Sequence, residues 1–248
     1  MLSGLLLLSV IVVAGSCLQR VSGMGFALIA GPVLSVVMGP VEGILVVNAL
    51  AVVNAAITTV TVRRHVDWRK CGLIASVLIF GSVPGALLVR EVSPALLQVL
   101  VGVLLLAALG IVTFGRRWMP EVSGRLPALA AGVIGGFMNT LAGIAGPALT
   151  VYTQVTRWPQ QTYAATMQPI FVVAGLISFS VKIVSGAGSL AETNWLIWPM
   201  GVVAMLLGIG LGSVATRYVS RPFAARLALL LAATGGVTVL LRGISGLD

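Results

Sequence analysis

The chain has 248 residues, of which 58% are hydrophobic and only 8% are charged. One soluble core cannot bury this much apolar surface, so the composition predicts an integral membrane protein and excludes an ordinary soluble domain. The net charge of +9 does not indicate nucleic-acid binding, because the 15 basic residues fall in short loops between apolar runs and no basic stripe is interleaved with aromatic residues.

The apolar runs predict a single membrane domain, residues 1–248, that is all-α: a polytopic helical bundle of about 8–10 transmembrane segments. Ten segments can be placed in chain order, at residues 2–18, 23–39, 42–62, 70–89, 94–114, 127–141, 144–156, 160–182, 195–216 and 222–241. The first, second, sixth and seventh are short for a hydrocarbon core of about 30 Å. Complete spans and the arms of re-entrant hairpins are both open for these four.

Two polar, glycine-rich stretches interrupt the apolar pattern, one near the start of each half. The first reads QRVSGMGFALIAGP from Gln19 to Pro32, and the second reads GGFMNTLAGIAGP from Gly135 to Pro147. Glycine and proline loosen a helix and leave backbone groups free to meet a ligand. Both stretches therefore predict broken or re-entrant helices. Elsewhere, Asp67 and Ser93 are predicted to cap the helices that follow them.

An internal repeat organises the chain. Gly31-Pro32 matches Gly146-Pro147 at an offset of 115 residues, and Pro40 matches Pro159 at an offset of 119. At an offset of 127, a longer series in the first half meets the same residue types in the second: Trp68, Gly81, Gly85 and Arg90 fall on Trp195, Gly208, Gly212 and Arg217. The matches predict a first repeat at residues 1–115 and a second at 127–242.

Five segments per half require the second repeat to be inverted relative to the first, as in many secondary transporters. With both termini outside, 12 basic residues face the cytoplasm and only Arg90, Lys182 and Arg242 lie outside. This is the asymmetry that the positive-inside rule favours. Lys182 is expected to extend its side chain to the outer interface.

These residues resemble the sulfite exporter TauE/SafE family of bacterial membrane proteins, also called toluene sulfonate uptake permeases. The resemblance covers nearly the whole chain and rests on its size, its two halves, the glycine-rich turns SGMGFALIAGP and GGFMNTLAGIAGP, and the proline-containing helix starts after them. It implies transport of sulfur-containing anions such as sulfite, thiosulfate or organosulfonates, and no cofactor. Family members often have a denser glycine run, whereas Met24 and Phe26 interrupt it here, so the exact substrate does not carry over.

The charge pattern also favours an anion. The six acidic residues fall at segment ends or in loops, so no carboxylate is placed to bind a cation within the membrane; they are Glu42, Asp67, Glu91, Glu121, Glu192 and Asp248. A desolvated anion would instead be held by amides, hydroxyls and the positive ends of half-helices.

The candidate substrate-binding residues are polar side chains and glycines at the two breaks and in the long segments that follow. They are Gln19, Arg20, Ser22, Gly23, Gly25, Asn48, Asn139, Thr140, Gly143, Tyr163, Thr166 and Gln168. Each polar one is open to a second interpretation: Arg20 as a cytoplasmic loop residue, and the others as hydrogen-bonding residues between helices. Asn48 and Asn54 lie six residues apart, so at most one of them faces a central path.

Enzyme chemistry is not indicated. The single histidine, His65, lies in a basic loop without partners for a catalytic dyad or a zinc site, and no phosphate-binding or dinucleotide motif is present. The sequence thus predicts a membrane transporter of the cytoplasmic membrane that moves a small sulfur-containing anion by alternating access. An anion channel and a non-transporting scaffold are the alternatives. Its partners are the anion and membrane lipid; the oligomeric state is open, a homo-oligomer included.

Overall fold

The computed structural model describes residues 2–23, 26–114, 121–191 and 193–247. Within these ranges the chain is helical and has no strand. The elements in chain order are α1 (Leu2–Ser22), α2 (Phe26–Met38), α3 (Pro40–Val62), the short 3-10 helix η1 (Arg63–His65), α4 (Trp68–Ala75), α5 (Leu78–Glu91), α6 (Pro94–Phe114), α7 (Leu126–Ala142), α8 (Gly146–Val155), α9 (Gln160–Val184), α10 (Ile197–Ala215) and α11 (Arg221–Ser245). The all-α class is confirmed.

Seven stretches in the described part of the chain are long and apolar enough to cross a membrane. One of them, Trp68–Glu91, comprises both α4 and α5, which a short turn at Ser76 and Val77 separates. Helices α2 and α7 are apolar but shorter, with 13 and 17 residues. At about 1.5 Å rise per residue, α2 covers roughly 20 Å, less than a full hydrocarbon core.

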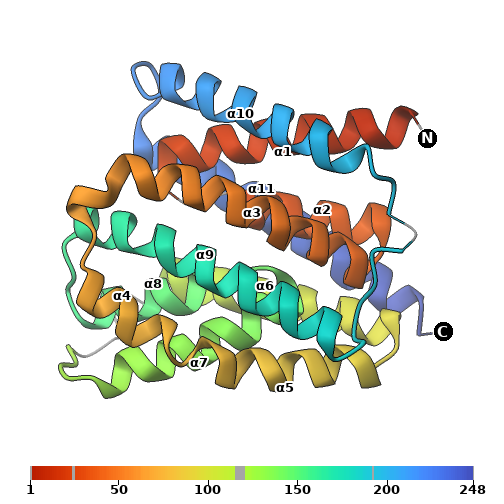
Figure 1. Cartoon of the computed structure of the whole chain (residues 1–248), viewed down its shortest axis with the longest axis horizontal. Coiled ribbons are helices and arrows are strands. Elements are labelled where there is room, and N and C mark those ends of the chain that lie inside the picture. Colours follow the sequence, from red (N-terminus) through yellow and green to blue (C-terminus); the bar gives the residue numbers. More distant parts are fainter. Residues whose placement is uncertain (1, 24–25, 115–120, 192, 248) are drawn as a thin grey trace.

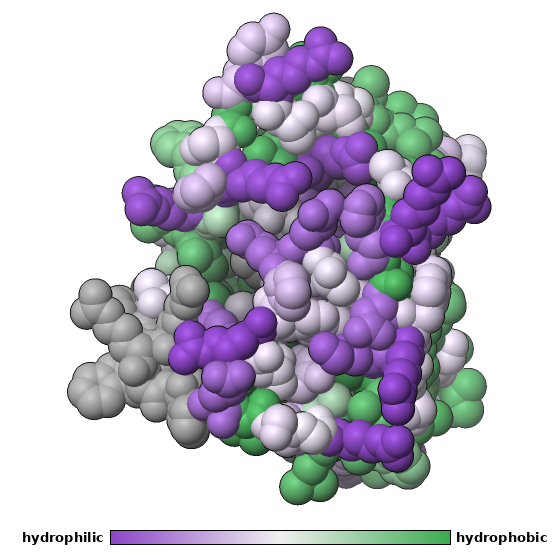
Figure 2. Space-filling model, turned by 90° about the vertical axis from the view of Figure 1, so that its left-hand side faces the viewer, coloured by the Kyte–Doolittle hydropathy of each residue, from purple (hydrophilic) through white to green (hydrophobic). Residues whose placement is uncertain are grey.

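The helices lie side by side along the long axis of the molecule (Figure 1). Both termini lie at one end, and the connections from α3 to α4, α8 to α9 and α10 to α11 lie at the other. Those connections carry Arg63, Arg64, Arg157 and Arg217, and Figure 2 shows hydrophilic residues across this end face. The basic loops and the termini are thus at opposite ends, which is the separation that the charge pattern predicts.

The two broken helix pairs leave from opposite ends of the bundle. The N-terminus and the start of α3 lie at the same end of the bundle, so the chain runs away from that end along α1 and back to it along α2 (Figure 1). Helices α7 and α9 both start at the end that carries the basic loops, so the chain runs away from that end along α7 and back to it along α8. The long helices α3 and α9 pack against each other through the middle of the molecule.

Two helix pairs, α1 with α10 and α5 with α7, approach closely at glycines. A methyl group at Gly81 would overlap the carbonyl oxygen of Val133, and one at Gly208 would overlap that of Val13. Gly81 and Gly208 are partners in the predicted repeat. Close backbone approach at small residues is how membrane helices gain packing energy, because lipid gives them little hydrophobic drive to associate.

Both predicted helix caps are confirmed. An Asp67 carboxylate oxygen accepts a hydrogen bond from the Lys70 backbone N–H at 3.0 Å, and the Ser93 hydroxyl accepts one from Leu96 N–H at 3.3 Å. The Asp67 backbone N–H in turn donates to the Thr166 hydroxyl at 2.9 Å. The loop after η1 is therefore fixed to both α4 and α9.

Replacing Asp67 with alanine is expected to lower the free energy of unfolding by about 1 kcal/mol, because the first turn of α4 loses its side-chain acceptor. The ion pair with Lys70 adds little, since its atoms are 3.9 Å apart and partly exposed. Thermal unfolding of the purified protein in detergent measures the change. Asp67→Asn keeps an acceptor oxygen and should retain most of the stability; an equal loss in both variants would mean that the cap is not the cause.

Candidate functional site

Both predicted interruptions are present, and both are built in the same way. Helix α1 ends at Ser22 and is followed by Gly23, with φ of +82°; α7 ends at Ala142 and is followed by Gly143, with φ of +73°. Each glycine N–H donates to the carbonyl oxygen four residues earlier, of Gln19 and Asn139 respectively, both at 2.8 Å. The left-handed conformation that stops each helix is one that glycine adopts without strain.

The side chains of those two residues form two buried amide pairs. Gln19 Nε2 donates to Gln168 Oε1 at 3.3 Å, and Asn139 Nδ2 donates to Asn48 Oδ1 at 3.2 Å. All four side chains are buried. The first pair joins the end of α1 to α9, and the second joins the end of α7 to α3. Each broken helix is thus fastened to one of the two long central helices.

The residues of the two amide pairs share one spacing in the sequence. The repeat matches described above do not include it. Gln19 and Asn139 are 120 positions apart, as are Asn48 and Gln168, and so are Gly23 and Gly143. At both positions an amide side chain in the first half corresponds to an amide side chain in the second, although a glutamine in one half corresponds to an asparagine in the other. This spacing is the signal in the sequence that groups the four residues.

Further hydrogen bonds hold each amide in place. The Gln19 side-chain oxygen accepts from the Phe26 backbone N–H at 3.3 Å, so it also caps the start of α2. Asn139 Nδ2 donates a second bond to the Ala174 carbonyl at 3.1 Å. Asn48 Nδ2 donates to the Ser178 hydroxyl at 2.8 Å. Buried polar groups satisfied in this way are rigid and well oriented.

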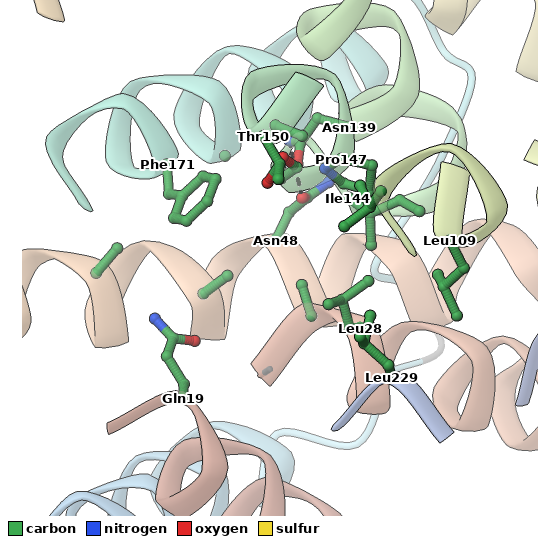
Figure 3. A pocket seen from close by; sticks show the side chains of 18 residues that line it. Gln19, Leu28, Asn48, Leu109, Asn139, Ile144, Pro147, Thr150, Phe171 and Leu229 are labelled. Carbon is green, nitrogen blue, oxygen red and sulfur yellow. Dashed lines mark hydrogen bonds between the residues drawn. The ribbon is translucent and has the colours of Figure 1, made fainter. Parts of the chain in front are cut away.

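A cavity of about 60 Å³ lies between these elements, at the middle of α3 and α9. Gln19, Asn48 and Asn139 line it, together with Thr150 of α8 and the aromatic ring of Phe171 (Figure 3). Leu28, Leu109, Ile144 and Leu229 supply apolar walls. A water molecule needs roughly 10–15 Å³ of such space, so the cavity has room for a few non-hydrogen atoms.

The starts of the short helices α2 and α8 reach this cavity. Ala27 and Leu28, in the first turn of α2, line it, as do Ala145, Gly146 and Pro147 at the start of α8. The first amides of a helix have no partner within the helix, and the helix dipole makes this end positive. The cavity therefore combines amide side chains, a hydroxyl and two positive helix ends.

Not all predicted residues line the cavity. Gln19, Asn48, Asn139 and Gly143 do, and Gln168 and Tyr163 are one contact removed, Tyr163 through a 2.6 Å hydrogen bond between its hydroxyl and that of Thr150. Thr140 Oγ1 donates within α7 to the Gly136 carbonyl, and Thr166 holds the Asp67 backbone. Ser22 donates to the Leu18 carbonyl at 2.7 Å, and Gly23 forms the turn. Gly25 is outside the described residues.

Arg20 lies on a different face of α1 from Gln19. Its Nε donates to the Ser213 hydroxyl of α10 at 3.1 Å, and it is not among the residues that line the cavity. Successive residues of a helix point about a quarter turn apart, so when Gln19 faces α9, Arg20 faces another neighbour. The same geometry separates the two asparagines of α3 as expected, because Asn54 donates to Ser16 at 3.0 Å and does not line the cavity.

The expectation for Lys182 is wrong. Its side chain does not extend to an interface but is 1% exposed, within the described part of the bundle. The cavity also has lining residues that the sequence did not single out as binding residues, among them Thr150, Phe171 and Gly175. Phe171 and Gly175 follow Gln168 by three and seven residues, so helical spacing from one glutamine would have found them.

A bundle of apolar helices with a small, mostly apolar cavity that a few buried amides line is an architecture found among membrane transport proteins. The chain belongs to the sulfite exporter TauE/SafE family, whose sequence profile matches residues 7–239. It is therefore a multi-pass membrane protein, and membership of an exporter family places it in the cytoplasmic membrane. The family is one of transporters, which argues against an enzyme.

One curated relative is the "Probable sulfite/organosulfonate exporter TauE" of Cupriavidus necator, 29% identical over 174 residues. The aligned region covers 66% of this chain and 62% of the relative, so this chain spans less than two thirds of that protein's length. No solved structure matches the chain.

Proposed function

We propose that the protein moves a small sulfur-containing anion across the membrane, with sulfite and thiosulfate preferred over larger organosulfonates. The single observation that carries this proposal is the cavity that Gln19, Asn48, Asn139 and the starts of α2 and α8 surround. Donor groups and positive helix ends favour an anion. A volume of about 60 Å³ suits a small oxyanion, whereas pockets for drug-sized ligands hold roughly 300–1,000 Å³.

The mechanism we propose is alternating access between two inverted repeats, residues 1–115 and 127–242 of one membrane domain. Three features support it. The amide pairs recur at one spacing, the glycine contacts of α5 with α7 resemble those of α10 with α1, and the two broken pairs leave from opposite ends (Figure 1). Rocking one repeat against the other would open the cavity first to one side and then to the other.

Uptake into liposomes that contain the purified protein tests the function. Sulfite, thiosulfate and taurine are offered in turn, and a transporter should show saturable uptake and exchange of internal for external substrate. Flux that never saturates and shows no exchange would indicate a channel instead. If none of the three anions moves, the proposed function is wrong.

Two asparagines of α3 provide a matched pair of variants. Asn48 and Asn54 are each 1% exposed, and each donates to a buried serine of another helix. Only Asn48 lines the cavity. Asn48→Ala is expected to raise the Michaelis constant for the anion about tenfold, the effect of losing roughly 1.4 kcal/mol of binding.

Asn54→Ala removes an equivalent hydrogen bond and should unfold at a similarly lowered temperature, yet transport with unchanged affinity. Uptake kinetics and thermal unfolding of both variants decide the matter. Equal changes in affinity would mean that the cavity is not the binding site.

A further inference from the structure

Lys182 is a buried lysine with no ion-pair partner among the described residues. Lys182 is 1% exposed, yet the ion pairs among the described residues are Lys70 with Asp67 and Arg90 with Glu91. Apart from the backbone bonds within α9, the hydrogen bonds of Lys182 to other described residues use its backbone carbonyl, which accepts from the Gly188 N–H and the Ser185 hydroxyl, and not its side-chain nitrogen. An ionised lysine buried without a partner would be costly, and an ionisable residue within a membrane helix is a candidate for a functional site.

The end of α9 does not account for this lysine. Cations near a helix C-terminus gain from the dipole and can bond the last free carbonyls. Here the carbonyls of Val181, Lys182 and Ile183 already accept backbone N–H groups from Ser185, Gly188 and Gly186. The last turn therefore has little need of an ammonium donor.

The register of α9 places Lys182 on the face that meets the cavity. Phe171 and Gly175 line the cavity, and Ser178 accepts from Asn48, which also lines it. Lys182 follows Gly175 by seven residues and Ser178 by four, the spacing of residues that share one helix face. Four residues rise about 6 Å, and helical side chains lean toward the helix N-terminus. Lys182 is not itself among the residues that line the cavity, but this general lean favours a side chain that points back toward Ser178 and the cavity.

We propose that Lys182 is the charged part of the substrate site and that the transported anion is its counter-ion. Building on the proposed function, this assigns the charge recognition to α9 and the hydrogen-bonding recognition to the side-chain amides of Asn48 and Gln19, since the hydrogen bonds above use one N–H of each. An anion in the cavity would be joined to Lys182 through Ser178, or directly once the lysine stem moves toward the cavity. Ligand binding would then neutralise the charge of an ionised Lys182.

Two kinds of measurement test the assignment on the purified full chain. Lys182→Met removes the charge and keeps an unbranched apolar stem, Lys182→Arg keeps the charge, and Arg90→Gln is the control. Arg90 is also basic and also lies in the last turn of a membrane helix, but its side chain is 57% exposed and lies 3.6 Å from Glu91. Sulfite uptake into liposomes gives the kinetics, and thermal unfolding with and without sulfite gives binding, since a ligand of the folded state raises its stability.

Lys182→Met should unfold at the same or a higher temperature than the parent when no anion is present, because an unpaired buried charge is gone. The same variant should lose the stabilisation by sulfite, and its Michaelis constant should rise about tenfold or more. Lys182→Arg should retain part of the uptake, and Arg90→Gln should behave as the parent. Opposite effects on stability and on binding are not expected of a residue that only supports the fold.

Three outcomes would overturn the assignment, and they are distinguishable. Parent kinetics in Lys182→Met would refute the role of Lys182 and leave the proposed function standing. If sulfite, thiosulfate and taurine neither stabilise the parent protein nor are taken up into liposomes that contain it, both the role of Lys182 and the proposed function are refuted. A Lys182→Met variant that unfolds at a lower temperature than the parent and is still stabilised by sulfite would show a residue that only supports the fold.

Discussion

Gly81→Ala is expected to prevent stable assembly of the bundle. The added methyl group would overlap the carbonyl oxygen of Val133 in α7 and crowd the backbone N–H of Phe137. Neither backbone atom can move without parting α5 from α7. Overpacking usually costs about 1–3 kcal/mol, and contact with the backbone of two α7 residues places Gly81 at the upper end of this range or beyond it. The yield of folded protein in detergent and its unfolding temperature are the measurements.

Two glycines of α10 supply the control within one helix. A methyl group at Gly210 meets nothing within 4 Å, so Gly210→Ala should be neutral or slightly stabilising, because alanine favours helix. Gly208 lies two residues earlier and would overlap the carbonyl oxygen of Val13, so Gly208→Ala should resemble Gly81→Ala. A tolerated Gly208→Ala or a harmful Gly210→Ala would show that the close helix approach is not what these glycines provide.

Asn139→Ala is expected to abolish most transport. Asn139 donates to both Asn48 and the Ala174 carbonyl, so its removal leaves two buried acceptors short of a donor and takes an amide from the cavity wall. The unfolding free energy should fall by about 1–3 kcal/mol. In a double-mutant cycle with Asn48→Ala, the two losses should couple by roughly 0.5–3 kcal/mol, because the residues are bonded to each other.

Thr140, the residue next to Asn139 in the sequence, tests where the binding site ends. Thr140 is 0% exposed and bonds within its own helix, and it does not line the cavity. Thr140→Val keeps its shape, so anion affinity should remain that of the parent. A loss of affinity as large as in Asn139→Ala would return Thr140 to the site and place the cavity boundary elsewhere. Liposome uptake over a range of sulfite concentrations separates the two results.

Local features of the fold can be predicted from the chain because their causes are local. The apolar runs fix where helices form. Asp67 and Ser93 cap the helices that follow them, and Gly23 and Gly143 end α1 and α7, since these glycines accept positive φ. In the site, Gln19, Asn48, Asn139 and Gly143 are predictable because polar residues and helix-ending glycines stand out in such an apolar chain.

Which face of a helix packs against which neighbouring helix is not determined by local sequence features. Arg20 and Gln19 are adjacent in sequence, which groups them as candidates, but one turns to Ser213 and the other to Gln168. Thr166 has the polarity of a binding residue, yet it holds the backbone of Asp67, which lies 99 residues away. Thr150 and Phe171 reach the cavity through packing that no local pattern encodes.

By itself, then, the sequence determined the membrane class, the helix positions, the two breaks and the expectation of an anion, because burial of apolar surface, helix capping and charge placement act on residues near one another in the chain. Only the tertiary structure decided which amides pair, that a cavity of about 60 Å³ forms between them, and that Lys182 is buried and does not reach the interface. Those outcomes depend on the rotation of each helix about its own axis, which is set by contacts between residues far apart in the chain.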